Sequence, residues 1–218
     1  MISIICVRFG AGYNLEQMRL RNDPQAQAFL ERSSYAIKAF PVKLDANVVL
    51  EVGMGKGEML TQLALINPEI TFIGIEKYPT VAMKAVRRAQ RLALTNFQVL
   101  AYDLAELNDA FTGVVEQIWL TFADPWPKKR HYKRRLTYTT YLQIYQKLLS
   151  KSGILKIKTD NDEFFRWSIH SIVNFGATIT YLTTDLHASD RAAGNIATGY
   201  ETKWHNQGKK INYMEVQF

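Results

Sequence analysis

LEVGMGKGE, residues 50–58, joins a short apolar run to an amphipathic segment, and the fold can be worked out from it. Gly53, Gly55 and Gly57 allow the backbone to turn tightly and to approach a ligand closely. The spacing differs from the dinucleotide fingerprint G-x-G-x-x-G, because Glu58 stands where the third glycine belongs. It also lacks the Lys-Ser/Thr pair of a phosphate-binding P-loop. Glu51, two residues before the first glycine, would repel a pyrophosphate but suits an ammonium or sulfonium cation.

Outward from this loop, short apolar runs alternate with segments of helical periodicity. We expect strands at Val48–Val52, Thr71–Glu76, Phe97–Ala101, Gln117–Phe122, Ile154–Lys158, Thr178–Thr183 and Ile211–Phe218, and helices near 58–66, 79–93, 138–149 and 164–173. This alternation predicts an open α/β fold with a parallel sheet and right-handed crossovers. The polar segment 184–208 is expected to be a long functional loop, and the tyrosines of 138–149 to pack in the core.

Acidic residues follow the successive predicted strands, at the sheet edge where such folds bind ligands. Glu76 can accept both hydroxyls of an adenosine ribose, and Asp103 can accept from an adenine amino group. Together with the glycine loop, these acids describe an adenosyl ligand without phosphates, S-adenosylmethionine. A nicotinamide or flavin nucleotide, or a turn with no ligand, is the alternative.

A basic run follows the fourth of these strands, in TFADPWPKKRHYKRR at residues 121–135. The chain has 27 basic and 20 acidic residues, a net charge of +7, and six of the cations lie in 128–135. Without them 21 basic residues face 20 acidic ones, so the excess is a local patch that favours a polyanionic partner. Asp124 is expected beside the transferred methyl group, and DPWP is similar to the [D/N]-P-P-[Y/F/W] signature of amino-methyltransferases. An aspartate that caps a turn, with a solvated charged face beside it, is the alternative.

Composition limits the remaining choices. The chain has 218 residues, one cysteine (Cys6) and four dispersed histidines, which argues against disulfides and a clustered metal site. No apolar run reaches the roughly 20 residues of a membrane span, and we expect a cytoplasmic protein. Residues 1–17 differ in character from the rest of the chain. We expect them to be an N-terminal extension or the product of an upstream start codon, with residues 18–218 as a single domain; an ordinary N-terminal strand is the alternative.

Several motifs in the expected order together resemble the bacterial tRNA (guanine-N7-)-methyltransferases. They are MRLRN (18–22), LEVGMGKGE (50–58), IGIE (73–76), DPWPKKRHYKRRL (124–136), KTDN (158–161), DLH (185–187), GNI (194–196) and TGYE (198–201). The resemblance covers about 200 of the 218 residues. It implies a Rossmann-like class I methyltransferase fold, with a mostly parallel seven-stranded sheet and helices on both faces. The implied reaction is transfer of a methyl group from S-adenosylmethionine to guanine 46 of tRNA.

The resemblance also implies roles for single residues. The cofactor set is Glu51, Gly53, Gly55, Glu76, Asp103 and Asp124, of which Asp124 is also catalytic. The substrate set is Lys128, Asp160, Thr198, Gly199, Tyr200 and Glu201. The RNA-binding set is Arg130, His131, Tyr132, Lys133, Arg134 and Arg135. Gly199 departs from the family pattern, which has a larger residue there. No metal is expected, and a monomer and a homodimer both remain open.

The implied chemistry needs alignment more than proton transfer. Guanine N7 carries an in-plane lone pair and no proton, so its attack on the methyl group requires no general base. Asp124 or Asp160 can accept from the guanine edge or stabilise the cationic product. Tyr200 and Glu201 can stack on the base and read its amino edge. We expect the basic helix face after Glu76, with Lys84, Arg87, Arg88 and Arg91, to be solvated, and contact with RNA is the alternative. An adenine-N6 methyltransferase and a noncatalytic RNA-binding protein are the alternative functions.

Overall fold

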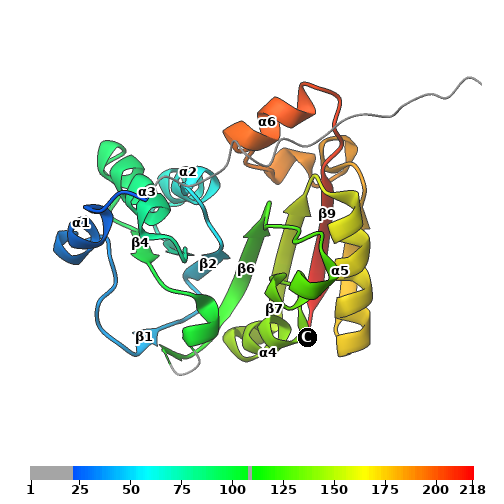
Figure 1. Cartoon of the computed structure of the whole chain (residues 1–218), viewed down its shortest axis with the longest axis horizontal. Helices are drawn as coiled ribbons and strands as arrows, with labels where there is room; N and C mark the ends of the chain where they lie inside the picture. Colours follow the sequence, from blue (N-terminus) through cyan, green and yellow to red (C-terminus); the bar gives the residue numbers. More distant parts are fainter. Residues whose placement is uncertain (1–21, 108–109) are drawn as a thin grey trace, which may run out of the picture.

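A computed structural model describes residues 22–107 and 110–218 of the chain. One central seven-stranded sheet has the strand order β4-β3-β2-β6-β7-β9-β8, and β9 alone runs antiparallel to its neighbours (Figure 1). Its strands are β2 (Val48–Val52), β3 (Thr71–Ile75), β4 (Phe97–Leu100), β6 (Val115–Thr121), β7 (Leu149–Thr159), β8 (Thr178–Thr183) and β9 (Asn212–Gln217). Two further short strands, β1 (Val42–Lys43) and β5 (Phe111–Thr112), pair with each other. The expected mostly parallel, seven-stranded α/β fold is therefore confirmed.

Helices cover both faces of the sheet, and each face has its own apolar core. The α-helices are α1 (Ala26–Arg32), α2 (Glu58–Ile66), α3 (Pro79–Arg91), α4 (Thr139–Leu148), α5 (Asp162–Phe175) and α6 (Gly199–His205). Side chains of α1, α2 and α3 pack in one core, and those of α4 and α5 in the other. Alternate residues of β2 serve the two cores: Val49 faces the first, and Leu50 the second.

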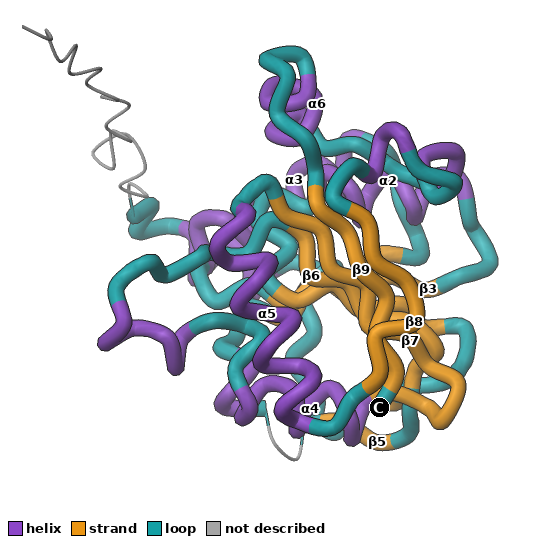
Figure 2. The backbone as a smooth tube through the Cα atoms, turned by 90° about the vertical axis from the view of Figure 1, so that its right-hand side faces the viewer, coloured by secondary structure: helices purple, strands orange, loops and turns teal. Residues whose placement is uncertain are grey.

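The register of the parallel strands brings their carboxyl ends to one edge of the sheet. Val52 of β2 lies opposite Ile75 of β3 and Leu120 of β6, and Thr121 lies opposite Lys158 of β7. The loops that follow these strands therefore meet at this edge. Helices α2, α3 and α6 gather at this end, whereas α4 lies toward the other (Figure 2).

Most expected elements match the structure, with two instructive differences. The predicted strands at 48–52 and 178–183 and the helix at 58–66 have the observed bounds. Strand β7 begins at Leu149, before the predicted 154, where its pairing with β6 changes register. The segment 184–208 is not a plain loop. It contains the 3-10 helices η4 (Leu186–Ala188) and η5 (Ala192–Gly194), followed by α6.

Other expectations concern the ends of the chain and its side chains. The expected N-terminal extension, 1–17, lies outside the described residues. None of the described helices is both long and apolar enough to cross a membrane. Tyr145 is fully buried in the core of α4 and α5, which confirms a core position for that member of the tyrosine stripe.

Candidate active site

The backbone N–H groups of the glycine loop between β2 and α2 donate hydrogen bonds to the end of β3 and to the residue that follows it. The Gly53 N–H donates to the Ile75 carbonyl at 2.8 Å, and the Gly55 N–H donates to Glu76 Oε2 at 3.1 Å. Gly57 has a φ of 65°, and a Cβ there would lie 2.9 Å from the Ala85 Cβ. Only glycine therefore lets α2 begin this close to α3.

Glu76 lies at the end of β3 and fixes the shape of this loop. Besides the Gly55 amide, its carboxylate accepts the Tyr78 N–H at 2.9 Å. Burial raises the pKa of Glu76, and the negative charge of Asp124 adds to the rise, while these backbone donors oppose it. Each carboxylate oxygen has a second lone-pair site, so Glu76 can still accept ribose hydroxyls.

Glu51 is the residue best suited to bind a cation. Its side chain is 2% exposed, and its Oε2 atom has no hydrogen-bond partner. Burial is the main reason that the pKa of Glu51 is raised to about 8; the Glu76 charge adds a smaller rise, and a hydrogen bond with Thr121 and the charge of Lys158 lower it. A buried carboxylate without a partner is costly. An ammonium group of a bound ligand would supply that partner.

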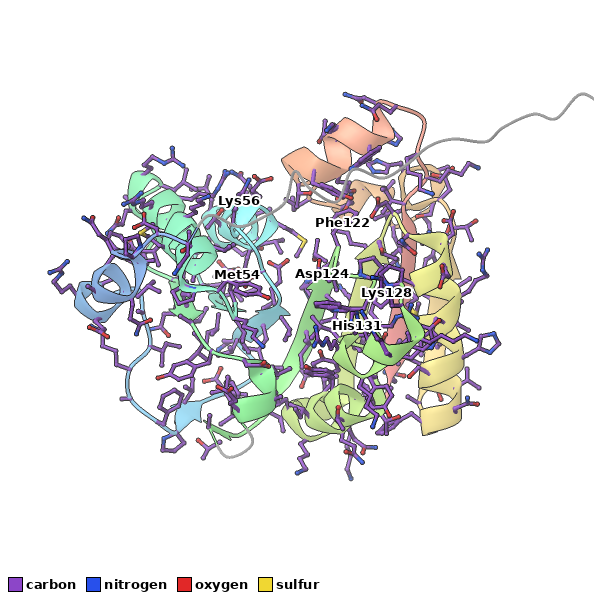
Figure 3. The ribbon with its side chains drawn as sticks, in the orientation of Figure 1. Met54, Lys56, Phe122, Asp124, Lys128 and His131 are labelled. Atoms are coloured by element: carbon purple, nitrogen blue, oxygen red, sulfur yellow. The ribbon has the colours of Figure 1, made fainter. Side chains whose placement is uncertain are left out.

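Asp124 follows β6 and completes a row of three carboxylates. Its side chain is exposed on one side, and burial against the surrounding protein raises its pKa. Glu76 is influenced electrostatically by Asp124, and Glu51 by Glu76, so the three acids share one region of the molecule. Figure 3 shows Asp124 between the glycine loop and the basic run. Glu76 is thus near enough to Glu51 and to Asp124 to affect both sites, whereas the role of these acids in binding a cofactor stays a prediction.

The backbone around Asp124 is strained. Phe122 and Trp126 have φ values of 51° and 42°, in the region that non-glycine residues rarely adopt. Such strain persists only where the surroundings fix it, and it clusters at functional sites. Here the two strained residues flank Asp124, which lies three residues after the end of β6.

Asp103 has partners within the protein. Its carboxylate accepts from Lys77 Nζ at 2.7 Å and from the Ala105 N–H at 3.1 Å, which caps the 3-10 helix η2 (Leu104–Glu106). Burial would raise the pKa of Asp103, but these donors outweigh it and leave the pKa below its usual value. Its contact with adenine stays a prediction.

The substrate-side residues Asp160 and Tyr200 meet across the site. The Tyr200 hydroxyl donates to Asp160 Oδ2 at 3.0 Å, and the Tyr200 ring lies 5.1 Å from that of Phe122. Asn161, not Asp160, caps α5 by accepting the Phe164 N–H. Asp160, the residue before this cap, therefore does not serve as the N-cap of α5.

The buried position of Glu201 does not fit its predicted role of reading the amino edge of the base. It is fully buried, and its Oε2 pairs with Lys158 Nζ at 2.7 Å. Lys158 also donates to Asn195 Oδ1 and the Ile196 carbonyl, so it ties α6 and the preceding loop to β7. Burial lowers the pKa of Lys158, and the Glu201 charge offsets part of that change. Lys158 was missed as a candidate residue, although KTDN contains it.

Two other residues of TGYE also serve the position of α6. Thr198 caps the helix by accepting the Glu201 N–H at 3.0 Å. The Gly199 N–H donates to Glu58 Oε2 at 2.8 Å, which connects α6 to the start of α2. A Cβ on Gly199 would lie 3.2 Å from that oxygen, so the absence of a side chain permits this approach.

The basic run forms the 3-10 helix η3 (Lys129–Arg134), and its last arginine differs from the rest. Lys128, Lys129, Arg130, Lys133 and Arg134 are exposed. Arg135 is 1% exposed, donates to the Trp126 carbonyl, and packs against the rings of Tyr132 and Trp167. The expected phosphate contact of Arg135 is therefore replaced by a role in holding the run in place.

The acids and histidines of the described residues are not arranged for metal binding. Within residues 22–107 and 110–218, no three His, Cys, Asp or Glu side chains are grouped as a metal site would require.

Comparison with known proteins identifies the fold and the family of this chain. A family model described as "Putative methyltransferase" matches residues 45–214. Structures of a methyltransferase from Streptococcus mutans in complex with SAH and of the 16S rRNA methyltransferase KamB align with TM-scores of 0.52 and 0.60. Each is 14% identical and covers 80% of this chain, with 90% and 88% of the respective neighbours covered, which supports the fold alone.

Curated relatives are much more similar. A tRNA (guanine-N(7)-)-methyltransferase of Mycoplasmopsis pulmonis is 51% identical over 92% of this chain and 99% of its own length. One of Mesomycoplasma hyopneumoniae is 49% identical over 92% of this chain and its whole length. The chain belongs to the tRNA (guanine-N(7)-)-methyltransferase family.

Proposed function

We propose that this protein transfers the methyl group of S-adenosylmethionine to N7 of guanine 46 in the variable loop of tRNA, acting in the cytoplasm. One observation carries the proposal: Glu51, Glu76 and Asp124 gather around the glycine loop, directly beside an exposed basic run. The acids suit a cationic methyl donor without phosphates, and the cations suit an RNA backbone.

The methyl donor fits the acids of this site. Glu51, which is buried and lacks a partner at Oε2, would pair with the ligand ammonium. Glu76 would accept the ribose hydroxyls, and the backbone at Gly53 and Gly55 would pass close to the ligand. Asp103 would face the adenine. When bound, the donor supplies an electrophilic methyl carbon, and S-adenosylhomocysteine is the product.

The acceptor needs alignment and negative charge. Guanine N7 forms the new bond through its in-plane lone pair as the carbon–sulfur bond breaks, and the guanine becomes cationic. Asp124 is exposed to the space in front of β6, where its charge would stabilise that cation. Tyr200 and Asp160, joined by a hydrogen bond, would contact the base, and Lys128 would contact its ribose-phosphate.

The proposed RNA surface includes exposed residues of the basic run and leaves out buried ones. Arg130, His131, Tyr132, Lys133 and Arg134 remain in the proposed surface, because their segment η3 lies on the outside of the molecule. Arg135 and Glu201 are assigned to supporting roles, since both side chains are buried. Thr198 and Gly199 position α6, which carries Tyr200.

Nucleoside analysis tests the proposal. The protein is incubated with unmodified tRNA and S-adenosylmethionine, and the digested nucleosides are separated by mass spectrometry. We expect 7-methylguanosine from the variable loop. Methylated adenosine without 7-methylguanosine would instead identify an adenine-N6 enzyme. Binding of tRNA without any S-adenosylmethionine binding in calorimetry would identify a noncatalytic RNA-binding protein.

A further inference from the structure

A basic hollow lies outside the site already described. It has a volume of about 660 Å³ and lies between α3 and the glycine loop. Its lining residues are Lys56, Lys84, Arg87, Arg88, Gln90 and Arg91. Five of these are cations, and none of the described residues that line the hollow is acidic. The hollow therefore concentrates positive potential in a concave surface.

The cations of α3 form a stripe of positive charge along one face of the helix, without the acidic residues that a solvated helix usually carries. Lys84, Arg87, Arg88 and Arg91 follow a spacing of three and four residues, so they share one face, while the opposite face is buried. A solvated helix usually mixes charges of both signs at this spacing. Helix α3 contains no acid, and like charges four residues apart destabilise it. A bound polyanion would remove that repulsion.

Internal partners neutralise only part of the stripe. Arg88 pairs with Glu58 at 3.4 Å, and Arg87 lies over the Phe29 ring at 5.3 Å. Within the described residues, Lys56, Lys84 and Arg91 have no ion-pair partner. These three exposed cations are thus available to an external anion.

The position of the hollow fits a large polyanion that spans the active site. Figure 3 shows Lys56 on one side of Asp124 and Lys128, the start of the basic run, on the other. We propose that the face of α3, with Lys56, is a second contact surface for the phosphate backbone of tRNA. This inference rests on the proposed function, and it favours RNA contact, the alternative for this face, over solvation. Bound tRNA would extend across the carboxylates, with its phosphates in contact with the α3 face on one side and the basic run on the other.

A charge-removal variant tests the surface. Lys84→Ala, Arg87→Ala and Arg91→Ala are combined, leaving Lys56 beside the glycine loop and Arg88 with Glu58. Binding of full-length tRNA is measured as a function of salt. Loss of three phosphate contacts should lower the log–log slope by about 2 to 3 and weaken binding at least about tenfold at 0.15 M salt. The KM for tRNA should rise accordingly, while kcat changes less than about twofold.

A control removes two positive charges from another surface. Lys147 and Lys151 are exposed near the start of β7, at the far end of the sheet, and Lys147→Ala with Lys151→Ala should leave the slope unchanged. Calorimetry with S-adenosylhomocysteine shows whether the triple variant keeps its fold and cofactor site. If it does not, the single charge reversal Arg91→Glu is measured in the same way.

The outcomes separate this inference from the proposed function. An unchanged salt slope in a folded variant, or an equal effect in the control, would overturn the second surface. Failure of the wild-type protein to form 7-methylguanosine would instead count against the proposed function, because it does not involve the variant.

Discussion

At the scale of single residues, the raised pKa of Glu51 leads to a prediction about the pH dependence of ligand binding. Burial raises its pKa to about 8, so most of the ligand-free protein carries a protonated Glu51 at pH 7. A ligand ammonium requires the ionised form, so binding releases a proton. We expect the affinity for S-adenosylhomocysteine to fall up to about tenfold per unit as pH drops from about 7.5 to 5.5. Calorimetry in buffers of different ionisation enthalpy measures both quantities.

Glu51→Gln provides the control for this prediction. The variant should bind the ligand weakly and without this pH dependence. Because the folded pKa lies above the unfolded one, ionisation of Glu51 opposes folding, and the ligand-free wild type should lose stability as pH rises from about 4.5 through 8. Glu51→Gln should lack this loss in urea unfolding. Wild-type affinity that does not vary with pH would contradict the assignment.

Asp124 makes a prediction about turnover. Asp124→Ala removes the charge that we place beside the cationic guanine, and kcat should fall by at least about 100-fold. The affinity for tRNA should fall less than about tenfold, or ~1.4 kcal/mol, because the basic surfaces remain. Single-turnover methyl transfer and filter binding measure the two effects. Turnover near that of wild type would remove Asp124 from its role.

The sequence predicted the position of the acids at one edge of the sheet. This was possible because parallel strands bring their carboxyl ends together, and the strands themselves were predicted correctly. The sequence did not predict that Arg135 is buried. Five neighbouring cations indicate solvent exposure, but the Trp167 ring that covers Arg135 comes from α5, which is distant in sequence. It also did not predict the pairing of Glu201 with Lys158, which joins residues 43 positions apart.

At the scale of elements, the attachment of α6 depends on that buried pair. Lys158→Met would leave the Glu201 carboxylate buried without its main partner, and we expect a loss of about 3–5 kcal/mol in the free energy of unfolding. Lys158→Met combined with Glu201→Leu should recover much of this loss, since no buried charge remains. Chemical denaturation of all four members of the cycle measures the coupling. Additive effects would show that the pair does not stabilise α6.

The sequence missed α6 for a physical reason. It has only seven residues, Gly199–His205, too few to show an apolar stripe, and isolated helices of this length do not form in water. Its stability comes from the Thr198 cap and from contacts with β7 and α2. The long helices and buried strands show clear periodicity, and their bounds were predicted closely.

The η3 element makes a prediction about RNA binding. Replacing Lys129, Arg130, Lys133 and Arg134 by Ala should lower the log–log salt slope of tRNA binding by about 3. Arg135→Ala should destabilise the fold instead, because this buried side chain packs against the rings of Tyr132 and Trp167. An unchanged slope in the fourfold variant would mean that the run is an ordinary solvated surface.

At the scale of the whole molecule, the sheet serves as a frame that brings two kinds of charge together. The carboxyl edge holds the acids, and basic surfaces lie on either side of Asp124 (Figure 3). A crystal structure of the complex with S-adenosylhomocysteine tests this arrangement most directly. The ligand ammonium should lie within hydrogen-bond distance of Glu51 Oε2, with the ribose hydroxyls on Glu76 and the sulfur facing Asp124. A ligand bound elsewhere, with Glu51 still lacking a partner, would contradict the account.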